Sequence, residues 1–122
     1  MVGVSQVTDQ VVIPQGGSEM VVWLFEVDGV PRDFTLWDGR IQIRSQRSLT
    51  ELILIDLSVD NGLLSLTHDG RVEADFTVDE VVKVPAGSSC VGELCLVDPA
   101  GNVSFPIRIE FESPAVATEA PA

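Results

Sequence analysis

The sequence predicts an all-β protein, folded as an antiparallel sandwich or barrel of about seven or eight strands. Short apolar runs rich in Val, Ile and Leu are separated by clusters of Gly, Pro, Asn and Asp, and no stretch has the long period of an amphipathic helix. With 122 residues, 45% of them hydrophobic and 21% charged, the chain is large and apolar enough to form one globular core.

The first two expected strands occupy different places in a sheet. "VTDQVVIP" (7–14) is typical of an edge strand because it stops at a proline. After a Gly-Gly turn, "EMVVWLFEV" (19–27) is almost continuously apolar, which predicts a largely buried central strand with Trp23 in the core. The Asp-Gly and Val-Pro pairs in "DGVPRD" (28–33) then predict a turn.

The segment "WDGRIQIRSQR" (37–47) holds three of the seven Lys and Arg residues in a chain of formal charge −12. Its side chains alternate, so Ile41 and Ile43 are expected to face the core and the polar side chains the solvent. A one-residue slip would bury the arginines, so the register of this strand is strongly specified. The expected polar face consists of Arg40, Gln42 and Arg44.

The second half of the chain is expected to hold the remaining strands. "ELILIDLS" (51–58), "LLSLT" (63–67) and "RVEADFTV" (71–78) follow one another across turns, and "CVGELCLV" (90–97) pairs with "NVSFPIRIEF" (102–111) across "DPAGN". Pro106 predicts an edge or a bulge in the last strand. One short helical turn is expected near 77–82, with Thr77 as its cap and Glu80 in capping-box spacing.

These elements suggest one domain over residues 1–112, with an apolar N-terminal arm that contains Val2 and Val4, and an Ala/Pro-rich tail over 113–122. The N-terminal residues lack the basic head and apolar middle of a signal peptide, so synthesis in the cytoplasm is expected. The apolar runs are too short to cross a bilayer. The net charge argues against partners that are nucleic acids or anionic membranes.

No catalytic motif or cofactor site emerges, and no small-molecule substrate is implied. Cys90 and Cys95 lie on opposite faces of a strand and too far apart to bridge, so both are expected to be reduced, the first in the core and the second more exposed. The lone His68 sits in a turn, and the cysteine spacing does not fit zinc. Calcium near Asp56–Asp60 stays open, although the spacing differs from an EF-hand loop.

Two features suggest a protein contact. The first is the set of three arginines, Arg40, Arg44 and Arg47. They form either a docking stripe for a carboxylate-rich surface or a charged, solvated strand face that prevents aggregation. Trp37, beside Asp38-Gly39, is either a lid over the core or an anchor at an interface.

Taken in order, several segments resemble the immunoglobulin-like module found at the N-terminus of tailed-phage baseplate upper proteins and in short free-standing virion proteins. The matching pieces are "DGVPRDFTLWDGRIQIRSQ", "LSVDNGLLSLTHDGRVEADFT", "VPAGSSCVGELCLVDPAGNV" and "FPIRIEF". The resemblance extends over nearly the whole chain up to Phe111, although the sequence has no tyrosine where aromatics are common in the module.

The resemblance implies an immunoglobulin-like β-sandwich with no enzymatic activity, located in the virion after assembly in the host cytoplasm. Its expected partners are other phage structural proteins and further copies of itself. The leading hypothesis is an adaptor of the tail, neck or baseplate that contributes to fibre attachment through the arginine face and the terminal arms. A capsid decoration or cement protein is the alternative, and a carbohydrate- or host-surface-binding module is a further one.

Overall fold

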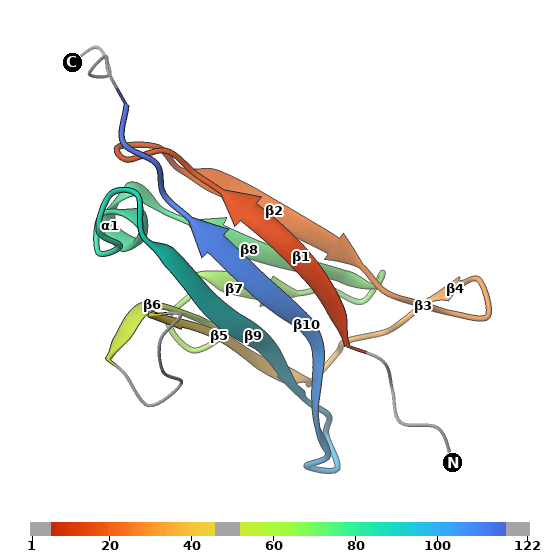
Figure 1. Cartoon of the computed structure of the whole chain (residues 1–122). Helices are drawn as coiled ribbons and strands as arrows, with labels where there is room; N and C mark the ends of the chain where they lie inside the picture. Colours follow the sequence, from red (N-terminus) through yellow and green to blue (C-terminus); the bar gives the residue numbers. More distant parts are fainter. Residues whose placement is uncertain (1–5, 46–51, 117–122) are drawn as a thin grey trace.

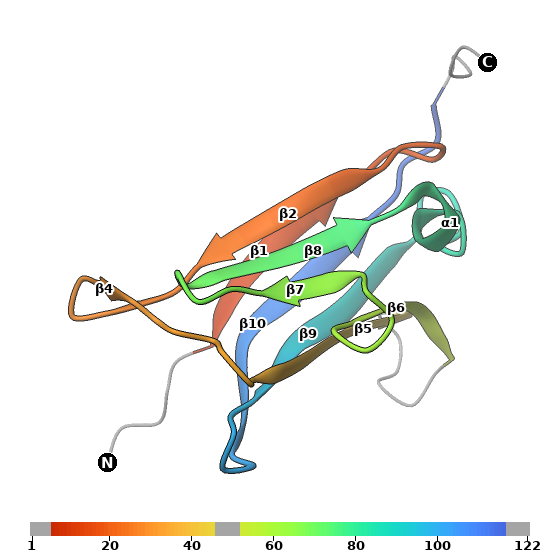
Figure 2. The ribbon, with the colours of Figure 1, turned by 180° about the vertical axis from the view of Figure 1, so that it is seen from behind.

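A computed structural model of the chain describes residues 6–45 and 52–116. Two sheets pack face to face and enclose the core, as Figure 1 and, from behind, Figure 2 show. The elements are β1 (Val7–Val12), β2 (Glu19–Leu24), β3 (Glu26–Val27), β4 (Val30–Pro31), β5 (Asp38–Ser45), β6 (Ile53–Ser58), β7 (Leu64–Leu66), β8 (Arg71–Phe76), α1 (Val78–Val81), β9 (Ser89–Val97) and β10 (Val103–Glu112).

The strand order identifies the architecture as an immunoglobulin-like sandwich. One sheet runs β1-β10-β9-β5-β6 and the other β2-β8-β7. The last four strands of the first sheet and the three of the second correspond to the G-F-C-C′ and B-E-D strands of the variable-type fold. These two sheets contain eight strands, as expected, and β3 and β4 form a separate small hairpin. The sandwich alternative of the sequence analysis is therefore correct.

In the constant-type immunoglobulin fold, strand A pairs with strand B in the same sheet, and the first strand of this protein departs from that arrangement. Instead, β1 pairs in parallel with β10, with Val7 opposite Ile107 and Val12 opposite Glu112. It forms the edge of the five-stranded sheet, as its sequence predicted. Because β1 belongs to the other sheet, β2 lies at the edge of the three-stranded one.

The expectation of a largely buried central strand over 19–27 is wrong. The segment is β2 and the short β3, and β2 alternates between half-buried and exposed residues. Trp23 packs against the core only in part, and its indole Nε1 donates a hydrogen bond to Asp9 Oδ2 at 2.8 Å. An apolar run indicates burial on both faces only where both faces are covered, and nothing described covers the outer face of β2.

The arginine-containing strand has the expected register. Ile41 and Ile43 are fully buried, whereas Arg40 is exposed and the two polar residues after it are half-buried. Inward residues of β8 alternate in the same way, with Val72, Ala74 and Phe76 in the core. Together with Phe111, whose ring stacks on Phe76 at 5.6 Å, they form the centre of the sandwich.

The predicted helical turn is α1, with Thr77 as its cap, but only half of the expected capping box forms, because the Thr77 backbone N–H donates to the carbonyl of Asp75. Thr77 Oγ1 accepts a hydrogen bond from the Glu80 backbone N–H at 3.3 Å. Glu80 has a second role, because its buried carboxylate accepts from the backbone N–H of Asp56 at 3.1 Å and pairs with Lys83. Glu80 therefore ties α1 to the outer edge of β6.

The last two strands form the predicted hairpin. Its turn is held by Asp98, whose Oδ1 accepts from the backbone N–H groups of Ala100 and Asn102. The register between β9 and β10 shifts between Ser104 and Ile107, which places Pro106 at the bulge that its sequence predicted. After β10, Ser113 is buried and its oxygen atoms bond Gln15 and Gly87, so the chain stays attached to the sandwich beyond 112.

Candidate functional site

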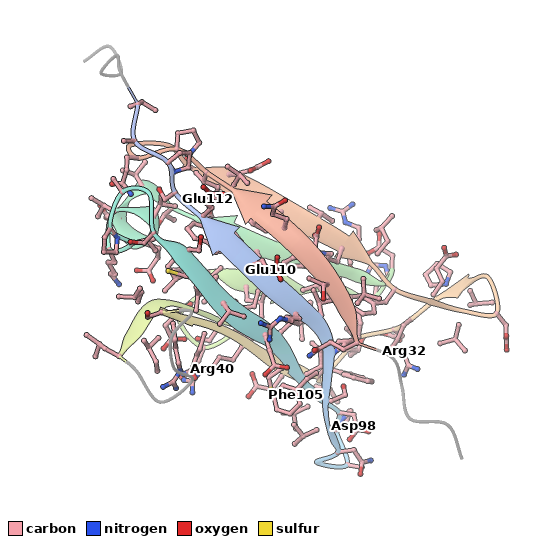
Figure 3. The ribbon with its side chains drawn as sticks, viewed as in Figure 1. Arg32, Arg40, Asp98, Phe105, Glu110 and Glu112 are labelled. Carbon is pink, nitrogen blue, oxygen red and sulfur yellow. The ribbon has the colours of Figure 1, made fainter. Side chains whose placement is uncertain are left out.

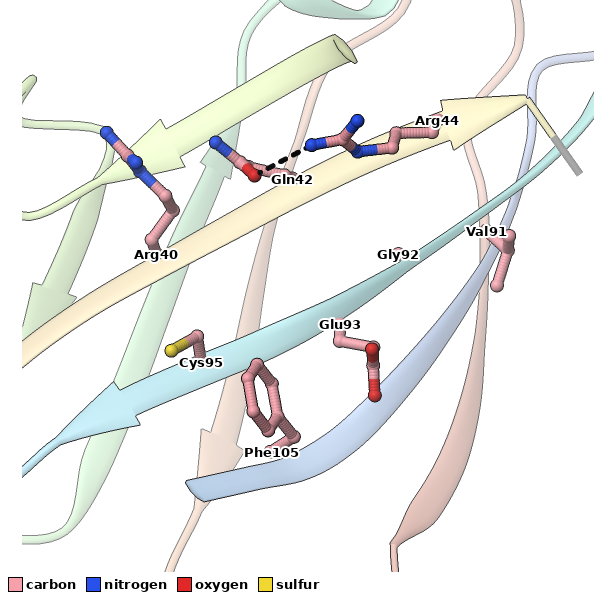
Figure 4. A pocket seen from close by; sticks show the side chains of 8 residues that line it. All are labelled: Arg40, Gln42, Arg44, Val91, Gly92, Glu93, Cys95 and Phe105. Atoms are coloured by element: carbon pink, nitrogen blue, oxygen red, sulfur yellow. Dashed lines mark hydrogen bonds between the residues drawn. The ribbon is translucent and has the colours of Figure 1, made fainter. Parts of the chain in front are cut away.

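The open face of the five-stranded sheet carries a hollow of about 290 Å³ that contains the predicted arginine face. We call it the arginine hollow. Figure 4 shows its lining, which comes from β5, β9 and β10. The lining residues are Arg40, Gln42, Arg44, Val91, Gly92, Glu93, Cys95 and Phe105.

Strand pairing brings these side chains together. In β5 and β9, Arg40 lies opposite Cys95, Gln42 opposite Glu93, and Arg44 opposite Val91. Directly opposite residues point to the same face, so the two strands form three polar or mixed rows across the sheet. The arginines lie on the β5 side of the hollow.

The hollow is polarised from one side to the other. Beyond the arginines, Glu93 on β9 accepts a hydrogen bond from Gln6 Nε2. On β10 the cation Arg108 lies opposite Glu93, and two acidic residues follow it along the strand. Figure 3 shows these two, Glu110 and Glu112, on the part of β10 remote from the Asp98 turn. A partner that matches this face needs anionic groups over β5 and fewer of them over the end of β10 that carries Glu110 and Glu112.

Arg40 already has an ionic partner within the chain. Its Nε lies 3.5 Å from Asp56 Oδ1, and the two side chains are 56% and 40% exposed. That oxygen is itself buried and accepts no hydrogen bond from the described residues, so the ion pair is what compensates its charge. The pair uses Nε, so Arg40 can offer its other guanidinium N–H groups to a carboxylate of a partner while Asp56 keeps its ionic contact.

Arg44 lies deeper in the face than Arg40. Its guanidinium donates to Gln42 Oε1 at 3.4 Å, drawn as the dashed line in Figure 4. The contact holds the amide and the guanidinium in one row along β5. Both side chains are half-buried, so they are partly ordered before any partner arrives.

The thiol of Cys95 is not a nucleophile suited to catalysis. Burial raises its pKa above the ordinary value, and the nearby Asp38 carboxylate raises it further, while Arg40 acts in the opposite direction. The thiol is protonated at neutral pH, and the thiolate is the reactive form. Cys90 is buried in the core, its pKa is also raised by burial, and neither cysteine is in a disulfide.

The opposing effects of Asp38 and Arg40 on the pKa of Cys95 predict how fast this thiol reacts with an alkylating agent. Replacing Asp38 by asparagine should speed modification of Cys95 by iodoacetamide at pH 8, because it removes a charge that raises the pKa of the thiol and disfavours the thiolate. Replacing Arg40 by glutamine should slow modification. Mass spectrometry of the adduct against time gives both rates, with Cys95→Ser as the control that identifies the site. Equal rates in all three proteins would contradict this assignment.

Trp37 immediately precedes β5 and does not line the arginine hollow. It is half-buried, its ring meets the fully buried Phe34 edge-on at 5.1 Å, and the guanidinium of Arg32 lies 5.3 Å from its ring centroid. The ring thus covers the core as the lid interpretation expects. A second, mostly apolar hollow of about 310 Å³ opens beside it, between Phe25 and Pro106.

The turn proposed for calcium uses its polar groups internally. Asn61 Oδ1 accepts from the backbone N–H of Ser58 and Leu63, and its Nδ2 donates to the carbonyl of Asp56. Within residues 6–45 and 52–116, no group of three or more His, Cys, Asp and Glu side chains is placed to share a metal ion. His68 is exposed in its turn. In the same ranges, no helix is long and apolar enough to span a bilayer.

Three predicted contact residues, Val2, Val4 and Arg47, lie outside the described residues. Conversely, the sequence did not indicate that Glu93, Cys95 and Phe105 complete the hollow. Alternation in "CVGELCLV" places Glu93 and Cys95 on one face, but it does not reveal that β9 is the neighbour of β5.

The fold and the hollow together define an immunoglobulin-like domain with a polar, open sheet face. No protein-family profile and no curated protein matches the chain. One solved structure, described as "Structure-based site-directed photo-crosslinking analyses of multimeric cell-adhesive interactions of VGSC beta subunits", is 14% identical to it. The alignment covers 97% of this chain and 98% of that one, with a TM-score of 0.44. A similarity of this size carries no argument about function.

Proposed function

We propose that this protein is a non-enzymatic structural protein of a tailed-phage particle, a docking adaptor of the tail, neck or baseplate. The observation that carries the docking role is the arginine hollow, where Arg40, Gln42 and Arg44 lie in one row on an open sheet face. The proposal that the particle is a tailed phage rests on the resemblance of the sequence segments, taken in their order along the chain, to phage virion modules. The chain then resides in the virion, with other phage structural proteins as partners.

The chemistry of the hollow supports a carboxylate-rich partner. Arginine binds carboxylates through two parallel hydrogen bonds, and a partly buried guanidinium loses less freedom on binding than a fully mobile one. The chain carries a formal charge of −12, so contact with an acidic surface is favourable only where its cations are concentrated. Many weak contacts of this kind, repeated by particle symmetry, give firm attachment.

Charge reversal tests the proposal. Arg40→Glu together with Arg44→Glu should reduce incorporation into phage particles at least about tenfold, because both sides of the contact then carry negative charge. The matched control is Arg71→Glu on the other sheet, since Arg71, like Arg40, is exposed and paired with a neighbouring carboxylate, that of Glu73. Normal incorporation of the folded double variant would overturn the docking role of this face.

Copy number in purified particles tests the location. A tail, neck or baseplate protein is present in few copies, whereas a capsid decoration protein is present in hundreds, following the symmetry of the shell. A capsid-like copy number would replace the adaptor proposal by the decoration alternative.

A further inference from the structure

The outer edge of β2 is the unprotected strand edge of this sandwich. Strand edges expose backbone donors and acceptors that pair readily with another strand, so proteins protect them with charges, prolines, short strands or covering groups. The two sheets have four edge strands, β1, β6, β2 and β7. Three of these carry such a feature among the described residues.

The edge of β6 is covered by side chains. The backbone N–H of Asp56 donates to Glu80 and that of Ser58 donates to Asn61, so groups that an added strand would need are already bonded. The edge strand β7 is only three residues long. The edge strand β1 carries the inward-pointing Asp9, bound to Trp23, and the chain meets Pro14 soon after it.

The edge strand β2 has none of these protections apart from Glu19 at its start. It is six residues long, and from Met20 to Leu24 it has no charge and no proline. Figure 2 shows it along the rim of the three-stranded sheet, and no other strand of that sheet lies beyond it in the described ranges. Its outward side chains are apolar and exposed, with Met20 at 54%, Val22 at 44% and Leu24 at 71%.

We propose that the edge of β2 binds β2 of a second copy of this chain, in antiparallel register centred on Val22. Antiparallel pairing keeps outward residues opposite outward residues only in registers centred on a residue. In the register centred on Val22, Met20 lies opposite Leu24 of the second copy and Val22 opposite Val22. All three exposed apolar residues of each copy are then paired with apolar residues.

The charges of the strand favour this partner. Glu19 falls opposite Phe25 of the second copy and Glu26 opposite Ser18, so no two carboxylates face each other directly. Over most of the acidic surface, two copies repel each other. The stretch from Met20 to Leu24 is itself neutral, and the carboxylates of Glu73 and Asp75 lie one strand further from the contact, on β8. The pairing joins two three-stranded sheets into one.

Val22 provides the test, because in this register the Val22 side chains of the two copies lie opposite each other at the twofold axis. Sedimentation equilibrium of the full chain should show a concentration-dependent dimer. Val22→Lys and Val22→Glu should each weaken it about tenfold or more, because each places like charges in direct opposition. An equimolar mixture of the two variants should restore the dimer through opposite charges.

Val12→Lys is the matched control, because Val12 is equally exposed, at 46%, on the neighbouring edge strand β1. It should dimerise as the unmodified chain does. A chain that stays monomeric at all concentrations overturns the proposal, as does a mixture of Val22 variants that fails to dimerise, or a Val12 variant weakened to the same extent. Circular dichroism confirms that each variant is folded, so a loss of dimer cannot arise from unfolding.

Discussion

Gly92→Ala is expected to destabilise the sandwich by about 3 kcal/mol, measured as the free energy of unfolding in urea. Gly92 lies on β9, directly opposite Ile43 of β5, and forms the floor of the arginine hollow. A Cβ at this position would press on the backbone oxygen of Gln42 and lie 2.8 Å from Ile43 Cγ1. The obstacle is strand backbone, which moves only if the pairing of β5 and β9 is disturbed.

Gly39→Ala is the control for this prediction. Gly39 is also buried in β5, but its added Cβ would meet the tips of leucine side chains, the nearest being Leu64 Cδ2 at 3.1 Å. Leucine tips can rotate away, so a loss of about 1 kcal/mol is expected. If the two alanine variants were equally stable, the close approach of β5 and β9 at Gly92 would not be the cause.

Phe34→Ala is expected to cost about 3–5 kcal/mol, although Phe34 lies in a loop. Its side chain is 1% exposed, and its ring makes edge-on contacts with Phe25 at 5.5 Å and Trp37 at 5.1 Å. Removing it leaves a cavity beneath the lid and frees the connection between β4 and β5. The same urea titration measures the loss, and Trp37 fluorescence should shift to longer wavelength as the indole becomes wetter.

Leu36→Ala provides the comparison within the same loop. Leu36 is 85% exposed, so its truncation should change the free energy of unfolding by no more than about 0.5 kcal/mol. A loss as large as that for Phe34 would mean that the loop itself, rather than the buried ring, supports the sandwich.

Local patterns predicted those elements whose two faces differ. In β5 the isoleucines alternate with polar residues, and in β8 Val72, Ala74 and Phe76 alternate with charged ones, so the period of two assigns each face without knowledge of the neighbours. Turns and caps were equally predictable, because Thr77 and Asp98 bond backbone groups only a few residues away. The arginine face was predictable for the same reason, because it depends on alternation along a single strand.

The segment over 19–27 has no such difference between its two faces. "EMVVWLFEV" is apolar at nearly every position, so its composition does not distinguish a strand covered on both faces from an edge strand with an exposed apolar row. The difference arises from β1, which pairs with β10 instead of β2. Residues one hundred positions apart determine that choice.

The sequence by itself determined most of the strands, the register of β5 and the concentration of arginine on its outer face, since each depends on alternation or on contacts between near neighbours. The short strand β4 fell within the turn predicted over 28–33. Only the tertiary structure decided that β9 lies beside β5, which turns a row of arginines into a hollow with Glu93 and Cys95, and that the edge of β2 is uncovered. Strand order depends on which distant strands exchange backbone hydrogen bonds. Those bonds are chemically alike for every strand, so no local pattern of side chains encodes them.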